Sequence, residues 1–444
     1  MRSPLTYRSL VTFCFPVLLL GACSSGSGNG GTGGQTGGAT GGSSTGGSSS
    51  GGSTGTGGAP NTGGSQGSGG INASGGNTGA GGTTGTGGTT GTGGSGGRSG
   101  TGGGTAGAPG TGGGGSSGSA YTCPTGVTTP TTLPSGSAAT KIAGAPPNDS
   151  FNNNGNNFTN VEGPVWIGNA LYFSEMVGSP NPPPARILKI DASDVVTSFF
   201  PAAGMTGDSG SNGLAVDRQG RLISANHGVG GLVAYDVQTG MKISPAIISS
   251  YNGKRFDSPN DLTIRSDGTI YFTDPSFQAA SPPPQSSTGV YMVPPGSTTA
   301  TAILTSLSNP NGIALSLDEK TLYVGHGGGV NSYAVNTDGT IGATATKVDP
   351  SNLDNNATDG MTIDCAGDLY VVRVNQHDVD VVSFGANPGS AGTHLGTIGN
   401  IPNAGQLTNV AFGGTDHKTL YFTAQGSSNH GVFKLAMPVP GMPY

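Results

Sequence analysis

The stretch "VEGPVWIGNALYFSE", residues 161–175, reads as an apolar strand, a tight turn and a second strand. The pattern recurs five more times along the chain, starting at Ser211, Pro259, Pro310, Thr358 and Thr408. An apolar pair opens the second strand of each copy: Leu171-Tyr172, Leu222-Ile223, Ile270-Tyr271, Leu322-Tyr323, Leu369-Tyr370 and Leu420-Tyr421. Successive pairs are 51, 48, 52, 47 and 51 residues apart. A repeat of this length, built only of strands and turns, is typical of a four-stranded propeller blade. The sequence therefore predicts an all-β, six-bladed β-propeller.

Each copy carries a carboxylate or an amide shortly before its apolar pair. These residues are Glu162, Asn212, Asn260, Asn311, Asp359 and Asn409. The innermost strands of a propeller surround one axis and run in the same direction, so equivalent positions form a ring at one end of the central channel. A single asparagine at such a position is also explained by strand capping. The whole ring is not, because Glu162 and Asp359 would repel each other with nothing between them.

The composition of this ring points to a bound cation. Two carboxylates and several amide oxygens, with no Cys or His, suit a hard divalent ion. We expect one ion, with Ca²⁺ as the first choice and Mg²⁺, Mn²⁺ or Zn²⁺ as alternatives.

The rest of the chain differs sharply in composition. Of 444 residues 87 are glycine, and only 9% are charged, with a formal net charge of −6. The few scattered basic residues exclude a nucleic-acid surface. Residues 23–120 are almost entirely Gly, Ser and Thr, which cannot bury enough apolar area to fold, so we expect a disordered linker. A lead-in segment, 121–154, and the propeller, 155–440, complete the chain and leave no room for a second domain. We expect a monomer.

The N-terminus has the features of an export signal. Arg2 and Arg8 precede an apolar run, 10–20, that is too short to span a membrane. The ending "LGAC" resembles the bacterial lipobox, which implies a lipoprotein signal peptide over 1–22 and lipidation at Cys23. The alternative is a secretory signal cleaved near Ala22. We expect an exported bacterial lipoprotein at the outer membrane, the cell surface or the periplasm, which touches the membrane only through its lipid.

Two cysteines remain after the signal peptide and the lipidated residue. Cys123 follows the linker, and Cys365 lies in the fifth repeat. An exported location permits a disulfide between them. Two separate thiols, with Cys365 a small buried residue, are the alternative.

The motifs "EGPVW", "SPNDL", "PNGIALSLDEKTLYV" and "DGMTID" resemble the gluconolactonase family, also called the regucalcin or senescence-marker-protein family. The resemblance covers 155–436. It implies a six-bladed propeller that holds one divalent metal in the channel mouth and hydrolyses sugar-acid lactones.

The resemblance also implies the roles of individual residues. The metal ligands fall on Glu162, Asn311 and Asp359, with Asp359 also the catalytic acid/base, and the contact to substrate or metal-bound water falls on Asn260. Some members carry a substrate-contacting Arg where this chain has Ser258. This departure bears on the recognition of a particular sugar acid.

Lactone opening by these residues would combine a metal-polarised carbonyl with attack of water. A carboxylate within reach would take the proton. A carboxylate that binds the metal fully is a poor base, so either Asp359 bridges metal and water or Asp261 assists. Strand alternation is expected to turn Asp261 away from Asn260, which ranks Asp261 second.

Two histidines follow second strands and precede glycine. His227 and His326 either pack at the rim or line the pocket mouth, and His227 is kept as a candidate substrate contact. Neither has a paired acid nearby that would suggest a catalytic triad. Two other functions remain open: a non-catalytic propeller that binds a partner at the cell surface, and a metal-dependent phosphotriesterase or arylesterase.

Overall fold

The computed structural model describes residues 121–142, 160–176, 185–201, 210–349, 351–425 and 430–442. All of them belong to the second of the two compact units into which the chain divides, Ala106–Tyr444. The expected signal peptide, Cys23 and the linker lie outside the described residues. Within that part, no helix has both the length and the apolar character needed to cross a bilayer.

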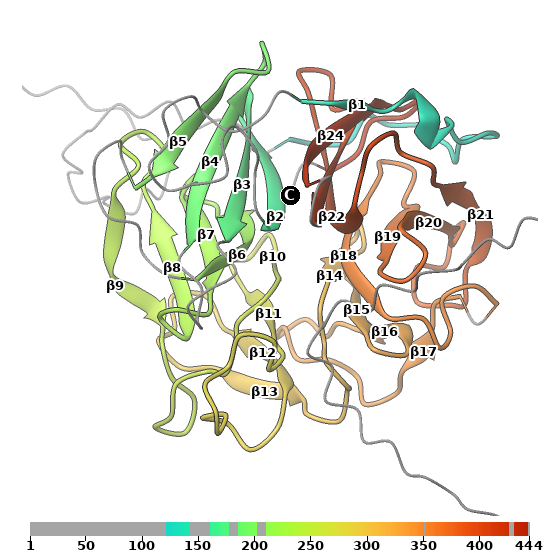
Figure 1. Ribbon diagram of the computed structural model, residues 1–444. Helices are drawn as coiled ribbons and strands as arrows, with labels where there is room; N and C mark the ends of the chain where they lie inside the picture. The colour runs from blue at the N-terminus through green and yellow to red at the C-terminus, as the bar shows by residue number, and fades with distance from the viewer. Residues whose placement is uncertain are drawn as a thin grey trace, which may run out of the picture. The chain divides into compact units, whose positions relative to one another are not determined.

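The described residues form six four-stranded antiparallel sheets, or blades (Figure 1). Blade 1 contains β2 (Asn160–Ile167), β3 (Ala170–Met176), β4 (Ala185–Asp191) and β5 (Val196–Phe200). Blade 2 contains β6 (Ser211–Val216), β7 (Leu222–Asn226), β8 (Gly231–Tyr235) and β9 (Lys242–Ile248). Blade 3 contains β10 (Leu262–Ile264), β11 (Ile270–Asp274), β12 (Gly289–Val293) and β13 (Thr301–Leu304).

Blade 4 contains β14 (Ile313–Leu315), β15 (Thr321–His326), β16 (Gly329–Ala334) and β17 (Thr346–Lys347). Blade 5 contains β18 (Thr358–Ile363), β19 (Leu369–Arg373), β20 (Asp378–Ser383) and β21 (Thr393–Ile398). Blade 6 contains β22 (Gln406–Gly413), β23 (Thr419–Gln425) and β24 (Gly431–Ala436). Its outermost strand is β1 (Thr140–Lys141), which follows a short 3-10 helix, η1 (Gly136–Ala138).

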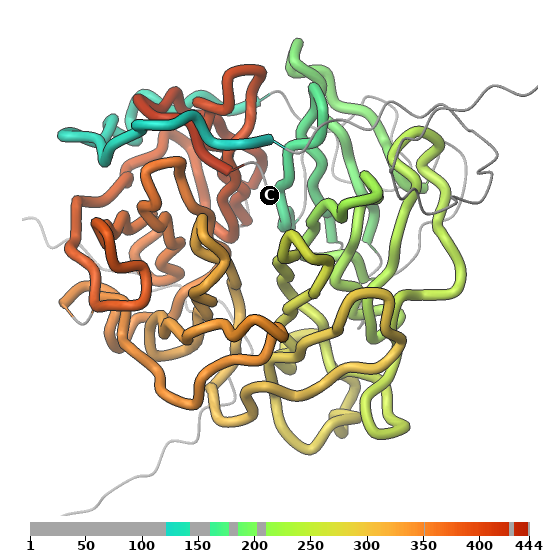
Figure 2. Tube along the Cα trace, turned by 180° about the vertical axis from the view of Figure 1, so that it is seen from behind, coloured from blue at the N-terminus to red at the C-terminus, as the bar shows by residue number. Residues whose placement is uncertain are grey.

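The innermost strands close into a ring. Each of β2, β6, β10, β14, β18 and β22 contacts the next in this order, and β22 contacts β2 again. The trace seen from behind shows the last blade beside the first (Figure 2). These observations confirm the six-bladed propeller predicted from the repeat spacing.

The core lies between neighbouring blades, in six clusters that each combine residues of two adjacent blades. The second strands of the blades are therefore buried on both faces, and every residue of β3 is buried. This explains why the apolar pair of each repeat carries two apolar residues in succession: Leu171 packs against blade 6 and Tyr172 against blade 2. The sole tryptophan, Trp166, stacks on Tyr421 of blade 6 at 5.7 Å between ring centroids.

The lead-in segment fastens the N-terminal side of the described unit to the last two blades. Cys123 is joined to Cys365 in a disulfide. Further along, β1 pairs with β24, with Thr140 opposite Lys434. The outermost strand of blade 6 is thus supplied by the segment that the sequence analysis sets apart from the propeller.

Candidate metal and lactone site

A β-bulge interrupts the start of the innermost strand at the ring position. The register shifts between Glu162 and Val165 in β2 and between Leu407 and Asn409 in β22. In blade 3, Asn260 donates its N–H to Thr273, which donates its own to Asp261, so two residues oppose one. Bulges re-aim side chains and often adjoin active sites. Here the bulges lie at the start of otherwise apolar strands, where they set the direction of the polar ring side chains.

All six ring side chains are buried, with exposed fractions between 2% and 8%. Glu162, Asn311 and Asp359, the expected metal ligands, start blades 1, 4 and 5, and Asn260 precedes blade 3. The side chain of Asn311 faces the carboxylate of Asp359 and lowers its pKa. The structure therefore brings the sequence-predicted residues to one level of one channel.

Asn409 connects the carboxylates of the ring. Its Oδ1 accepts the N–H of Val410 at 2.8 Å, which leaves the amide N–H groups to donate. The Asn409 side chain faces the carboxylates of Glu162 and Asp261 and lowers the pKa of both. The resemblance gave Asn409 no ligand role, and its function as a donor became visible only in the structure.

Three carboxyl groups share this buried space. Burial raises the pKa of Glu162 well above its usual value, and the nearby Asp359 and Asp261 carboxylates raise it further. Burial also raises the pKa of Asp359 to about 8, with Asp261 adding to the effect. Burial raises the pKa of Asp261 to about 7, despite hydrogen bonds from Leu262, Ile313 and Asn409. No Lys, Arg or His among the described residues counters these charges.

The donor set fits a hard divalent cation. Two acidic residues, Glu162 and Asp359, and the amide of Asn311 offer only oxygen ligands, and ionised carboxylates buried together need a positive charge to compensate them. In the described part of the chain, no three His, Cys, Asp or Glu side chains are arranged to hold one ion. Any ion in the ring would therefore depend on amide oxygens besides the two carboxylates.

Glycines next to the ring leave space for the crossing side chains. A Cβ on Gly360, which follows Asp359, would lie 1.9 Å from Cγ of Asn409. A Cβ on Gly213 would lie 2.6 Å from Oδ1 of Asp261. Neither position could carry a larger residue while Asn409 and Asp261 keep their places.

Asp261 lies among the carboxylates of the site, although the expected strand alternation places it second to Asp359 as a candidate base. It precedes the regular strand β10, so strand alternation does not govern its direction. Its carboxylate interacts with those of Glu162 and Asp359. It also borders a cavity of about 530 Å³ that occupies the channel beyond the ring and ends at the turns near Arg218, Ser266 and Glu319.

The segment before Asn260 is held by a buried acid that the sequence analysis did not single out. Asp274, at the end of β11, accepts the N–H groups of Asp257 and Ser258 at 3.0 and 2.7 Å. Burial raises the pKa of Asp274 to about 7. Its signal in the sequence is similar to that of Glu162: each is a lone charge at one end of an apolar strand, Glu162 near the start of β2 and Asp274 at the end of β11.

Ser258, at the position where some family members carry an Arg, is fully buried. Its hydroxyl donates to Gln278 Oε1 at 2.8 Å and accepts the Gln278 N–H at 3.1 Å. Gln285 also binds this region, donating its N–H to Asp257 at 2.7 Å. The proline-rich insertion around 280–287 is thus fastened to the segment that leads to Asn260. The other such insertion, 178–185, lies almost wholly outside the described residues.

The two histidines differ in their surroundings. His227 is fully buried between β7 and β8, and its carbonyl oxygen accepts a hydrogen bond from Arg255. His326 ends β15, where its Nδ1 accepts the N–H of Gly328 at 3.0 Å. Burial lowers the pKa of His326. Whether His227 contacts substrate stays a prediction.

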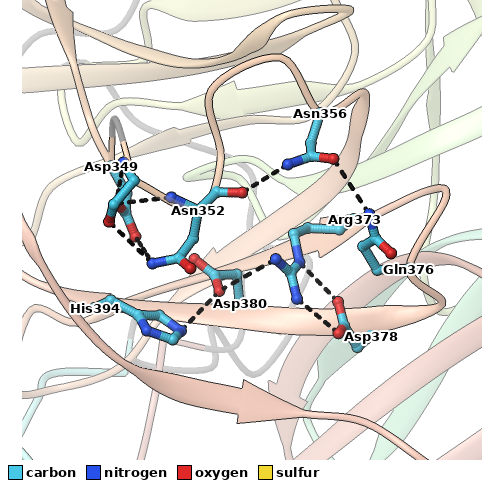
Figure 3. A network of polar contacts seen from close by, with 9 residues as sticks. Asp349, Asn352, Asn356, Arg373, Gln376, Asp378, Asp380 and His394 are labelled. Carbon is cyan, nitrogen blue, oxygen red and sulfur yellow. Dashed lines mark hydrogen bonds and ion pairs between the residues drawn. The ribbon is translucent and has the colours of Figure 1, made fainter.

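A polar network lies along the chain segment that leads from blade 4 to Asp359 (Figure 3). Asp349 accepts hydrogen bonds from Asn352, whose carbonyl accepts one from Asn356 at 2.7 Å. Beside them, Arg373 forms a two-pronged ion pair with Asp378 at 2.8 and 2.7 Å. The contacts among Asp349, Asn352 and Asn356 hold the segment 351–357 that leads into β18.

The network also contains a buried acid that faces a histidine. Asp380 is fully buried and lies 3.0 Å from His394 Nε2. Burial raises the pKa of Asp380 to about 6, although His394 and Arg373 oppose the shift.

The fold and ring define a six-bladed propeller with an acidic, amide-lined channel site. Residues 161–426 match the family described as SMP-30/Gluconolactonase/LRE-like region. The chain belongs to this family.

Named relatives are found among both sequences and structures. A gluconolactonase of Zymomonas mobilis is 35% identical over 179 residues, which cover 37% of this chain and 48% of that protein. Lactonase drp35 of Staphylococcus haemolyticus is 33% identical over 140 residues, covering 31% of this chain and 41% of that protein. The chain thus spans less than half the length of these curated relatives.

Two solved structures share the fold. A gluconolactonase from Xanthomonas campestris is 25% identical, with a TM-score of 0.52 over 67% of this chain and 89% of that one. A luciferin-regenerating enzyme is 19% identical, with a TM-score of 0.50 over 64% of this chain and 95% of that one.

Proposed function

We propose that this protein is a divalent-metal-dependent lactonase that opens a sugar-acid lactone or a related cyclic ester. The observation that carries the proposal is the cluster of three buried carboxyl groups, uncompensated by any described cationic side chain, at the mouth of a gluconolactonase-family propeller. The relatives named gluconolactonase and lactonase support the substrate class.

Glu162, Asn311 and Asp359 would hold the ion. The bound ion would polarise the lactone carbonyl and lower the pKa of a water molecule. Asp359 would accept the proton of the attacking water, because its carboxylate is buried at the ring and fixed by the Asn311 amide. Asn260 would orient the substrate from blade 3. The Asn409 side chain, which lowers the pKa of Glu162, would keep that carboxylate in place.

A paired experiment tests this function. Ca²⁺ binding is titrated by calorimetry for the parent, Glu162→Gln and Asp359→Asn, and each protein is screened on sugar lactones, acyl lactones and aryl phosphotriesters. Both variants should bind Ca²⁺ more weakly and lose most lactone hydrolysis. If both bind Ca²⁺ like the parent and keep full turnover, the ring is structural. If the parent binds Ca²⁺ but hydrolyses no ester, a binding propeller replaces the lactonase.

We also propose that the enzyme is an exported lipoprotein anchored at Cys23. The pairing of Cys123 with Cys365 supports an oxidising compartment, since disulfides persist outside the cytosol.

A further inference from the structure

The ring depends on the junction where the propeller closes. Blade 6 meets blade 1 through β22 and β2, which come from opposite ends of the folded unit. The side chain of Asn409 in β22 interacts with the carboxylate of Glu162 in β2 across this junction and lowers its pKa. A contact that holds β22 against β2 therefore also holds the Asn409 amide beside the Glu162 carboxylate.

The hydroxyl group of Thr408 connects β22 to β2. Thr408 Oγ1 donates to the carbonyl oxygen of Val161 at 2.7 Å and lies 2.8 Å from Thr423 Oγ1. Thr423 in turn donates to the carbonyl oxygen of Asn409 at 3.2 Å. The two threonines and Val161 have no exposed surface. Because Val161 precedes Glu162 and Thr408 precedes Asn409, this contact ties the backbones of the two ring residues together.

A buried hydroxyl cluster also joins blades 1 and 2, but it serves a different ring residue. Ser174 Oγ donates to the carbonyl oxygen of Asn212 at 2.6 Å and lies 2.7 Å from Ser211 Oγ. Ser224 Oγ continues this cluster at 3.0 Å from Ser211. Neither of the ring carboxylates, Glu162 and Asp359, nor Asp261 receives a described hydrogen bond from Asn212, so this cluster offers a matched comparison.

We infer that Thr408 is a positioning residue for the cation site, setting the separation between Glu162 and Asn409 across the propeller closure. The inference rests on the proposed metal dependence. Without the hydroxyl, the peptide groups before the two ring residues lose their direct connection, and the Glu162 carboxylate loses its fixed place beside the Asn409 amide. Partners that orient metal ligands in this way commonly affect metal affinity about 10- to 100-fold.

Calorimetric titration with Ca²⁺ alone tests the inference. Thr408→Val keeps the side-chain shape without the hydroxyl and should weaken Ca²⁺ binding by about 10-fold or more. Thr408→Ser keeps a hydroxyl and should restore most of the affinity. Ser224→Ala removes a buried hydroxyl from the blade 1–2 cluster and should bind Ca²⁺ like the parent.

A second readout comes from Trp166, the only tryptophan, which stacks on Tyr421 at the same junction. The Ca²⁺ dependence of its fluorescence should shift to higher concentration in Thr408→Val and not in Ser224→Ala. Urea unfolding checks that each variant folds, and Thr423→Val, which removes the hydroxyl beside Thr408, gives the same comparison if Thr408→Val does not fold.

The outcomes separate this inference from the proposed function. Unchanged Ca²⁺ affinity in Thr408→Val, or an equal loss in Ser224→Ala, overturns the positioning role. A parent that binds none of Ca²⁺, Mg²⁺, Mn²⁺ and Zn²⁺ overturns both proposals. A parent that binds Ca²⁺ without hydrolysing a lactone overturns only the function, and the affinities of the variants still decide the role of Thr408.

Discussion

The side chain of Asn409 in the last blade interacts with the carboxylate of Glu162 in the first blade and lowers its pKa. The same amide also lowers the pKa of Asp261 in blade 3, so one side chain interacts with carboxylates of two other blades across the channel. The ring is therefore a set of mutually dependent groups. A change at a residue with no expected ligand role should still disturb the site.

Asn409→Ala tests this dependence. The substitution removes the amide donor from two buried carboxylates, and an unsatisfied buried group costs about 1–3 kcal/mol. We expect the free energy of unfolding to fall by about this amount and Ca²⁺ binding to weaken. Urea unfolding and calorimetry measure the two effects. Asn212→Ala is the control, and equal behaviour of the two variants would contradict the bridging role of Asn409.

The raised pKa values predict how pH affects the ion-free protein. The pKa of Asp359 is about 8 and that of Asp261 about 7, against about 3.8 for ordinary Asp. Between these values the folded state binds more protons than the unfolded state, so stability should fall as pH rises from about 5 to about 8. Bound Ca²⁺ should oppose this loss, because the cation compensates the ionised carboxylates.

Thermal unfolding with EGTA or with excess Ca²⁺ measures both effects across that pH range. The stabilisation by Ca²⁺ should increase with pH. Asp359→Asn should show a shallower pH dependence without Ca²⁺, since one of the shifted groups no longer titrates. An ion-free melting temperature that rises with pH over this range would contradict the prediction.

The disulfide should stabilise the closed unit. Cys123–Cys365 fixes the lead-in segment to blade 5, while β1 in the same segment completes blade 6. Its removal is expected to cost about 2–4 kcal/mol, because the bridge restricts the unfolded chain. Cys123→Ser should therefore unfold at lower urea concentration. Added reductant should lower the midpoint of the parent but not that of the variant, and a parent insensitive to complete reduction would count against this contribution.

Membrane attachment is tested independently of the propeller. Cys23→Ala should move the protein from the membrane fraction to the soluble fraction, because the acylated residue is lost. Its Ca²⁺ affinity and thermal unfolding should match those of the parent released from the membrane with detergent. A variant that still sediments entirely with membranes would refute the lipid anchor.

The repeat pattern was sufficient to predict the blades and the ring. A propeller makes equivalent positions of each repeat meet at one axis, so the spacing that identifies the fold also brings Glu162, Asn311 and Asp359 together. The pattern could not predict β1, because two residues, Thr140 and Lys141, carry no detectable strand signal. Local sequence does not indicate which distant strand pairs with the edge of a sheet, so the completion of blade 6 by β1 could not be predicted.

The same limit applies to the contacts inside the ring. The role of Asp261 depends on its place before the regular strand, where strand alternation no longer holds. The role of Asn409 depends on the bulge in β22 and on Gly360, which leaves space for the Asn409 side chain. Only three-dimensional coordinates bring these features together.

That glycine gives the sharpest test of the crossing geometry. Gly360 has no positive φ that would itself favour glycine, but a Cβ there would lie 1.9 Å from Cγ of Asn409 and 2.0 Å from its Oδ1. Gly360→Ala must therefore displace the Asn409 side chain, and with it the donor to Glu162. We expect a loss of stability of about 1–3 kcal/mol, as for other overpacked sites, together with weaker Ca²⁺ binding.

Gly389→Ala is the matched control, since a Cβ at that position would meet only Thr321 Oγ1, at an ordinary 3.6 Å. It should change neither quantity. The double variant Gly360→Ala/Asn409→Ala separates crowding from loss of the donor. Removing the displaced side chain should recover part of the stability lost in Gly360→Ala but not the Ca²⁺ affinity, because the amide is absent in the double variant. If Gly360→Ala alone binds Ca²⁺ as tightly as the parent, Asn409 does not hold Glu162 for the cation.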